Sequence, residues 1–171
     1  MKLNLVTDNA GLNQALFQIT HGLYIVTTRV EDRLNGQCLD ALMQVTSAPP
    51  RISIGMGTGS LTHEMIATSG RFVVSVLDRE DSACGDVIRR FGFQSGRDVD
   101  KFAGFPCEMT EQGIPFLPNA VAFYECTVLR DLTTDLGTHS LLVASVDRAG
   151  TREGGEPLTY NEYRKHLRKG G

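Results

Sequence analysis

Short strand-like segments dominate this chain, and the connections between them are too short for repeated helical crossovers. The strand-like segments, rich in β-branched, aromatic and other apolar residues, span residues 22–30, 37–45, 52–56, 72–77, 122–129 and 140–146. Helix-like patterns are fewer and span residues 11–19, 61–68 and 81–91, with a last short one near the C-terminus, and Gly70 is predicted to end the second of them. Parallel strands need crossovers of a dozen or more residues, so the sequence predicts a mostly antiparallel barrel with peripheral helices. The first strand is followed by no G-x-G-x-x-G motif, which argues against a doubly wound nucleotide-binding sheet.

Turn signals refine this pattern in the first third of the chain. Asn35-Gly36 is a strong hairpin signal, so it predicts a tight turn between the strands at residues 22–30 and 37–45. Pro49-Pro50 closes the second of these strands, because proline cannot take part in a central ladder. Residues 72–77 form a nearly continuous apolar run, which predicts a strand buried on both faces.

Length and charge exclude some classes of function. Residues 1–171 fit a single domain that is long enough to bury a core without disulfides or metals. The formal net charge of −3 and the pI near 5.8 argue against nucleic-acid binding, which normally needs a basic patch. The basic residues between positions 164 and 169 are better explained as the solvated face of a terminal helix.

Cysteine spacing and hydropathy bear on the compartment. The chain has four cysteines, without CxxC spacing and without histidines at ligand distance in the sequence, so a metal site is not expected. The N-terminus lacks the features of an export signal, and no apolar run approaches the length of a membrane span. We therefore expect a cytoplasmic protein with reduced thiols and no membrane partner.

The segment Gly57-Thr58-Gly59-Ser60-Leu61-Thr62-His63 is the first candidate site. Glycines and hydroxyls alternate here and lead directly into a helix-like pattern. A loose loop at a helix start offers free backbone N–H groups and the positive end of the helix dipole, which together suit a phosphate. The simpler alternative is that Ser60 only caps the helix, and the two interpretations are compatible. A phosphate-bearing cofactor would bring its own chemistry, which fits a chain without an evident nucleophile.

The predicted strand at residues 37–45 and the segment after it form the second candidate. With a period of two, Cys38, Asp40 and Gln44 share one face, and Thr46 and Ser47 follow. A polar strand face that ends in two hydroxyls suits a flat heterocycle with several donors and acceptors. A half-exposed strand with a wet face explains the pattern equally well, and Cys38 is equally consistent with a buried, inert thiol.

Two cations and one histidine complete the local candidates. Arg97 and Lys101 lie in a polar loop, and either is able to neutralise a phosphate, although Arg97 is also placed to pair with Asp98 or Asp100. His139 immediately precedes the apolar strand at residues 140–146. A histidine at a strand edge is more often structural than catalytic, and no Ser/His/Asp or Cys/His pairing follows from the spacing.

A set of short motifs runs in order along nearly the whole chain, from the first helix to Tyr163. The motifs are ITHGLYIVTT at 19–28, NGQ at 35–37, QVTS at 44–47 with PP at 49–50, LTH at 61–63, FGF at 91–93, SGRD at 95–98, DKF at 100–102, GTH at 137–139 and PLTY at 157–160. Each motif is weak alone, but the ordered set is specific. It resembles the flavin reductase-like family, the FMN-binding split barrel, and is most similar to flavoredoxins and the flavin domain of high-molecular-weight rubredoxins.

The resemblance implies a homodimeric, six-stranded antiparallel split barrel with one FMN per subunit near the dimer interface. Matching positions would line the flavin ring and ribityl chain, hold the phosphate, and place His139 near the reacting face of the ring. The implied cofactor-binding residues are Cys38, Leu39, Asp40, Ala41, Gln44, Val45, Thr46, Ser47, Thr58, Ser60, Leu61, Thr62, Ser95 and Lys101.

Two positions depart from the family pattern. The family often has asparagine where this chain has Asp40, and a Lys-x-Asn pattern where it has Thr58-Gly59-Ser60. The phosphate loop therefore lacks a lysine, and Lys101 and Arg97 are the candidates to supply the missing cation. A carboxylate beside the flavin would also disfavour the anionic reduced ring.

The function implied by the resemblance is that of an FMN-dependent oxidoreductase. It would take electrons from NADH or NADPH and pass them to free flavin, a metal ion or an acceptor protein. Two alternatives stay open at this point. One is a non-enzymatic, flavoredoxin-like FMN-binding electron carrier, and the other is a barrel that has lost its flavin.

Overall fold

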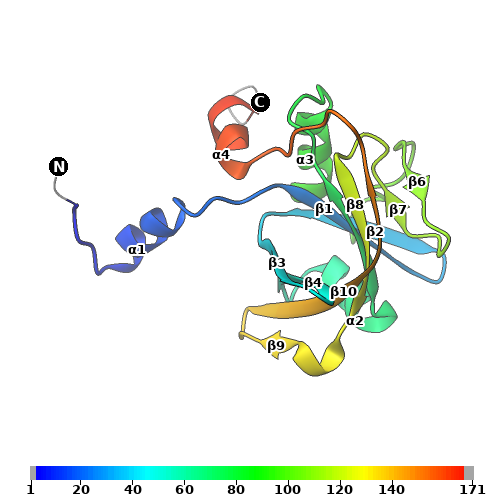
Figure 1. Cartoon of the computed structure of the whole chain (residues 1–171), viewed down its shortest axis with the longest axis horizontal. Coiled ribbons are helices and arrows are strands. Elements are labelled where there is room, and N and C mark those ends of the chain that lie inside the picture. The colour runs from blue at the N-terminus through cyan, green and yellow to red at the C-terminus, as the bar shows by residue number, and fades with distance from the viewer. Residues whose placement is uncertain (1–2, 168–171) are drawn as a thin grey trace.

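A curved antiparallel sheet forms the body of the protein. The computed structural model describes residues 3–167 (Figure 1). The sheet strands are β1 (Tyr24–Val30), β2 (Arg33–Leu39), β3 (Leu42–Ser47), β4 (Pro50–Gly57), β5 (Arg71–Val76), β8 (Ala122–Val128), β9 (Thr134–Asp135) and β10 (His139–Thr151). Their order is β2-β1-β5-β8-β10-β4-β3, with β9 attached to β10, and all pairs are antiparallel. The predicted antiparallel, mainly β fold is confirmed, but this sheet has eight strands rather than six, because residues 37–45 are divided between β2 and β3 and the short β9 pairs with β10.

The predicted hairpin is present, because β1 pairs antiparallel with β2, but its turn does not lie at the predicted position. Asn35 and Gly36 lie inside β2, opposite Thr28 and Thr27 of β1, and not in a turn. The turn comes earlier, where Glu31 takes a left-handed backbone with φ 53°. Gly36 serves packing instead, because a Cβ at this position would lie 3.0 Å from the Val26 carbonyl oxygen.

The predicted strand at residues 37–45 is broken in two. At the break, the Leu42 amide donates to the Asp40 carbonyl at 2.9 Å, and the Gly55 amide donates to the Ala41 carbonyl at 2.8 Å. This tight turn separates β2 from β3. The expectation that Cys38, Asp40 and Gln44 share one strand face was therefore wrong, since a period of two cannot continue through a turn.

The helices lie outside the sheet. They are α1 (Asn9–Leu16), α2 (Leu61–Ser69), α3 (Cys84–Gly92), the short α4 (Tyr160–Glu162), the 3₁₀ turn η1 (Arg130–Leu132) and the π-helical turn η2 (Tyr163–Leu167). Asp8 caps α1 and accepts from the Gly11 amide at 2.9 Å. Gly70 ends α2 with φ 69°, as the sequence predicts for a glycine C-cap. A small hairpin of β6 (Glu108–Met109) and β7 (Pro115–Phe116) lies beside the main sheet.

Two apolar clusters fill the fold. One cluster combines side chains of β1, β2, β4, β5, β8 and β10 with one from α2, so the curved sheet wraps around a shared core. Its buried members are Val26, Leu39, Ile52, Ile54, Met56, Ile66, Phe72, Val74, Cys126, Leu142 and Ala144. The second cluster lies between the outer face of the sheet, α3 and the C-terminal segment, with Phe91 1% exposed. β5 contributes to the wrapped core and is buried from Phe72 to Val76, which confirms the strand expected to be covered on both faces.

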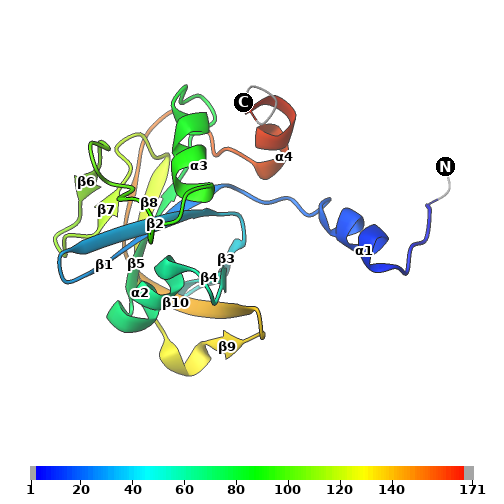
Figure 2. The ribbon, with the colours of Figure 1, turned by 180° about the vertical axis from the view of Figure 1, so that it is seen from behind.

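The N-terminal segment stands away from this body. α1 has no buried residue, and Figure 2 shows it apart from the barrel on an extended segment. None of the helices among residues 3–167 is both long and apolar enough to cross a bilayer.

Candidate functional site

A cavity of about 280 Å³ lies where the start of α2, the strand β2, the end of α3 and the following loop meet. Its lining residues are Asn35, Gln37, Cys38, Gly59, Ser60, Leu61, Thr62, Phe91, Gly92, Gln94, Ser95, Gly96, Arg97 and Lys101. Six of the predicted cofactor-binding residues are among them: Cys38, Ser60, Leu61, Thr62, Ser95 and Lys101. Segments that are distant in sequence therefore converge on the predicted phosphate loop.

The start of α2 presents hydrogen-bond donors to this cavity. The Ser60 hydroxyl accepts from the His63 amide at 3.1 Å, so Ser60 is the helix cap that the sequence predicts. In the described part of the chain, the Leu61 and Thr62 amides donate to no backbone carbonyl. Because both residues line the cavity, capping and anion binding are compatible here.

Asn35 is a buried site residue that the sequence does not reveal, because the Asn35-Gly36 pair predicts a turn. Its side-chain amide donates to the Thr62 hydroxyl at 3.0 Å. Gly96 packs against the same amide so closely that a Cβ there would lie 2.1 Å from Asn35 Oδ1. Through these two contacts, Asn35 of β2 connects Gly96, in the loop after α3, to Thr62 at the start of α2.

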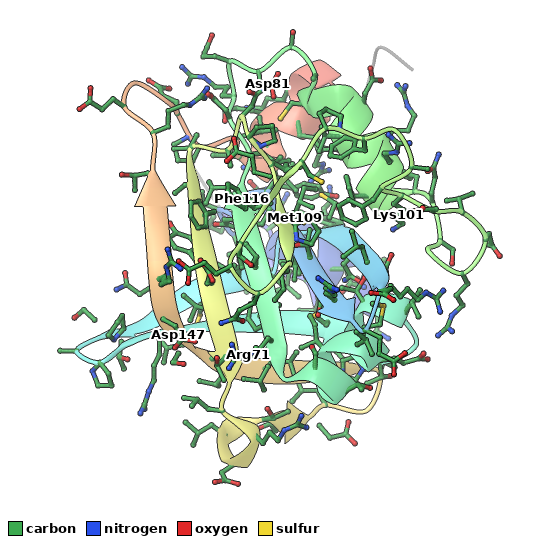
Figure 3. The ribbon with its side chains drawn as sticks, turned by 90° about the vertical axis from the view of Figure 1, so that its right-hand side faces the viewer. Arg71, Asp81, Lys101, Met109, Phe116 and Asp147 are labelled. Carbon is green, nitrogen blue, oxygen red and sulfur yellow. The ribbon has the colours of Figure 1, made fainter. Side chains whose placement is uncertain are left out.

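Lys101 is the buried cation of the cavity wall (Figure 3). It is 4% exposed, and its Nζ donates to the carbonyls of Gly36 at 2.9 Å and of Phe91 at 3.2 Å. The ammonium also lies 5.9 Å from the centre of the Phe91 ring. Burial lowers the pKa of Lys101. Two of its three N–H donors go to carbonyls, which leaves one for another acceptor.

Arg97 lines the cavity from the exposed side of the same loop. Its guanidinium pairs with Glu64 on α2, and not with Asp98 or Asp100 as its neighbours in sequence suggested. It also borders, with Gly96, a wider surface hollow of about 580 Å³ on the other side of the loop. The ion pair therefore holds this loop against the helix start.

Cys38 offers a neutral thiol to the cavity. Burial, and then the nearby Asp40 carboxylate, raise the pKa of this thiol to about 12. The thiol is therefore protonated near neutral pH and is a poor nucleophile. All four cysteines are free, and no three His, Cys, Asp or Glu side chains of the described residues gather as a metal site.

The other predicted residues lie outside this cavity. Leu39 is buried in the wrapped core, and Asp40 and Ala41 form the turn between β2 and β3. Four further predicted residues belong to β3, at the edge of the sheet, and are mostly exposed: Gln44, Val45, Thr46 and Ser47. Thr46 and Ser47 pair with the start of β4, whereas Ser60 follows its end, so the two hydroxyl clusters are about 20 Å apart along the strand.

Thr58 and His139 lie together at the end of β4, just before α2. His139 is exposed and stands opposite Gly57 in the sheet, and its Nδ1 is 2.9 Å from the Thr138 hydroxyl. The Thr58 hydroxyl donates to the Thr138 carbonyl at 3.2 Å. His139 is thus paired with Gly57, the residue just before the loop that leads to the cavity, but it does not line the cavity.

Comparisons with known proteins identify the family of this chain. The profile of the family described as "Flavin reductase like domain" matches residues 16–169. The high molecular weight rubredoxin of Moorella thermoacetica is 42% identical over 151 residues, which cover 88% of this chain and 64% of that protein. The NAD(P)H ferric-chelate reductase of Archaeoglobus fulgidus is 36% identical over 159 residues, or 92% of this chain and 90% of the relative.

The fold has matches among solved structures as well. The NADH:FAD oxidoreductase of Streptomyces globisporus C-1027 superposes with a TM-score of 0.82 at 23% identity, covering 93% of both chains. The flavin reductase PheA2 in its native state superposes with a TM-score of 0.75 at 22% identity. At these identities the structures show the shared fold, while the profile covers nearly the whole sequence. The chain therefore belongs to the flavin reductase-like domain family.

Proposed function

We propose that this protein binds FMN and passes electrons from NADH or NADPH through it to an acceptor. The observation that carries the proposal is the cavity at the start of α2, where free amides, hydroxyls and two cations converge. Membership of the flavin reductase-like family supports it, as do relatives whose names describe NAD(P)H-dependent reductases.

The residues present fit the phosphate of FMN. The Leu61 and Thr62 amides and the hydroxyls of Ser60 and Thr62 are donors, and the dipole of α2 favours an anion at this end. Lys101 and Arg97 border the same cavity and replace the lysine that the phosphate loop lacks. The phosphate would bind here, and Cys38 and the turn at Asp40 and Ala41 would face the rest of the cofactor.

When bound, FMN would supply the electron transfer itself, because no side chain of the cavity does that chemistry. The protein's residues bind and orient the cofactor and the nicotinamide, and they exclude water from the contact between them. The neutral Cys38 thiol provides a soft, uncharged wall. If the ring lies near the turn at Asp40 and Ala41, the Asp40 carboxylate would disfavour added negative charge on it.

We also propose that His139 positions the nicotinamide or supplies a proton at the flavin ring. Its imidazole is exposed at the end of β4, where a second ligand has access to it. Thr138 holds the imidazole through Nδ1, so Nε2 is the nitrogen available to such a ligand.

A homodimer is part of the proposal. The exposed apolar side chains of the N-terminal segment and the exposed edge strand β3, which carries predicted cofactor-binding residues, both lack cover within the described chain. A second copy would cover them. The four free cysteines support a reducing, cytoplasmic compartment.

The test is the visible spectrum of the purified protein. Yellow protein whose acid-released cofactor comigrates with FMN is expected, and addition of NADH or NADPH without oxygen should bleach it. Colourless protein that also fails to take up added FMN would refute flavin binding.

The same titration decides the second candidate function, an electron carrier that exchanges electrons with an acceptor protein and binds no nicotinamide. Its support is the 42% identity to a high molecular weight rubredoxin, of which this chain spans 64%. Reduction by dithionite but by neither nucleotide would favour the carrier.

A further inference from the structure

The Asn35 side chain meets the Thr62 hydroxyl inside the wall of the cavity. Asn35 comes from β2 and is 3% exposed, and Thr62 belongs to the first turn of α2 and is 2% exposed. The Asn35 Nδ2 lies 3.0 Å from Thr62 Oγ1, and both residues line the cavity. Two buried polar groups from distant segments therefore share one hydrogen bond at the proposed phosphate position.

The direction of this hydrogen bond follows from the packing of Gly96. An ideal Cβ on Gly96 would lie 2.1 Å from Asn35 Oδ1 but 3.1 Å from Nδ2. The amide oxygen thus faces a glycine C–H, which it tolerates as a weak acceptor. In the flipped orientation of the amide, the NH₂ hydrogens would point at that C–H. The unflipped orientation, with Nδ2 toward Thr62, is therefore favoured. Asn35 donates, and Thr62 accepts.

Because the Thr62 oxygen accepts this bond, the hydrogen of its hydroxyl is not used in it. A helical threonine commonly turns its O–H back to a carbonyl of the preceding turn, and Thr68 of the same helix does so, donating to Glu64 at 3.0 Å. Thr62 does not. Within the described part of the chain, no other hydrogen bond involves its hydroxyl. Its single hydrogen therefore remains available to a ligand in the cavity.

We propose that Asn35 is a positioning residue that orients the Thr62 hydroxyl as a donor to the phosphate of the bound flavin nucleotide. This inference rests on the proposed function, since it assumes that the phosphate binds at the start of α2. Asn35 makes phosphate recognition selective for the nucleotide over the free vitamin by acting through Thr62 and not by contact with the flavin ring.

The test measures dissociation constants for FMN and for riboflavin, which differ only in the phosphate. Asn35→Ala should weaken FMN binding about tenfold while riboflavin changes by no more than about twofold. Thr62→Val, which removes the hydroxyl at constant shape, should weaken FMN binding similarly, and Thr62→Ser should retain it. Unchanged riboflavin binding shows that each variant is folded.

The double variant Asn35→Ala/Thr62→Val tests the route of the effect. If Asn35 acts through Thr62, Asn35→Ala should have little further effect on FMN once the hydroxyl is gone. Additive losses would overturn the inference, and so would equal losses for FMN and riboflavin, which indicate a purely structural role. Wild-type protein that binds both flavins equally would instead refute the phosphate position, and with it the role of Asn35, while leaving flavin binding itself intact.

Asn35→Asp supplies an independent readout that does not rely on Asn35→Ala. The ionised carboxylate must accept from Thr62, which turns the hydroxyl hydrogen away from the cavity, and it adds a negative charge. The preference for FMN should therefore be lost at pH 8 and return in part as the pH falls and the carboxyl protonates. The wild type at each pH is the reference, because the phosphate itself titrates near pH 6. A pH-independent ratio of variant to wild type would contradict the inference.

Discussion

Lys101 and Arg97 are the two cations at the cavity, and their surroundings separate their roles. Lys101 is buried and held by two backbone carbonyls, one of them near the C-terminal end of α3. Its loss would leave a hole in the wall and would remove the donor that both carbonyls share. Arg97 is exposed and paired with Glu64, so it can exchange that partner for a ligand phosphate at small cost. Lys101 therefore stabilises the cavity wall, while the Arg97 side chain is able to change its partner.

His139 carries a prediction at the scale of one residue. His139→Ala should leave FMN bound, because the imidazole does not line the cavity. It should slow reduction by NADH or NADPH by on the order of 10²-fold, the usual effect of losing a positioning or proton-donating group. Stopped-flow spectra without oxygen measure the rate.

Dithionite is the control for His139→Ala, since it needs no nicotinamide site and should reduce the variant at the wild-type rate. A variant that matches wild type with both nucleotides would make His139 a structural residue at the strand edge.

At the scale of elements, α2 links the fold to the site. Its first turn leaves two amides toward the cavity, and its apolar face, including Ile66, packs into the wrapped core. Burial of an isoleucine side chain stabilises a fold by about 1.5–3 kcal/mol, so the helix start is held firmly in place. A rigid helix start needs no reorganisation to receive an anion.

Replacement of Ser60 and Thr62 by alanine should weaken FMN binding far more than riboflavin binding. A hydrogen bond to a charged group contributes about 1.5–3 kcal/mol, so the pair should shift the FMN dissociation constant well over tenfold. Fluorescence titration with both flavins gives the ratio.

Two matched variants separate binding from stability in that experiment. Ser60→Gly retains most of the helix cap that Ser60→Ala loses. Thr68→Ala removes a hydroxyl from the other end of α2, where it bonds to the Glu64 carbonyl, and should leave both affinities unchanged. Equal weakening of FMN and riboflavin by the Ser60 and Thr62 changes would move the phosphate elsewhere, most simply toward Arg97 and Lys101.

At the scale of the whole molecule, the N-terminal segment is the feature that the rest of the chain leaves uncovered. Leu5 is 94% exposed and Leu16 57% exposed, and α1 buries no residue. A contact with the body is made by Phe17, whose ring lies 4.7 Å from the Arg164 guanidinium. An apolar segment of this size is normally covered by a partner.

The whole-molecule prediction is a homodimer that depends on α1. Light scattering with FMN bound should give twice the mass of one chain at micromolar concentration. Leu12→Glu/Leu16→Glu should shift the protein toward the monomer, because charges replace two exposed apolar contacts on the helix. Asn13→Glu/Gln14→Glu adds the same charge to polar positions of the same helix and should leave the dimer intact. A wild-type monomer would refute the prediction.

The sequence by itself determined the class of fold, the Ser60 cap, the Gly70 stop and the family. These follow from local rules: a period of two or 3.6, a hydroxyl before a helix, and a glycine after it. Tertiary structure alone decided the rest. Asn35-Gly36 forms strand and not turn because Gly36 packs beneath Val26 and Phe91, and local sequence does not encode that contact. Asn35 and Thr62 are 27 positions apart and meet only when α2 packs against β1 and β2, so their hydrogen bond has no signal along the chain.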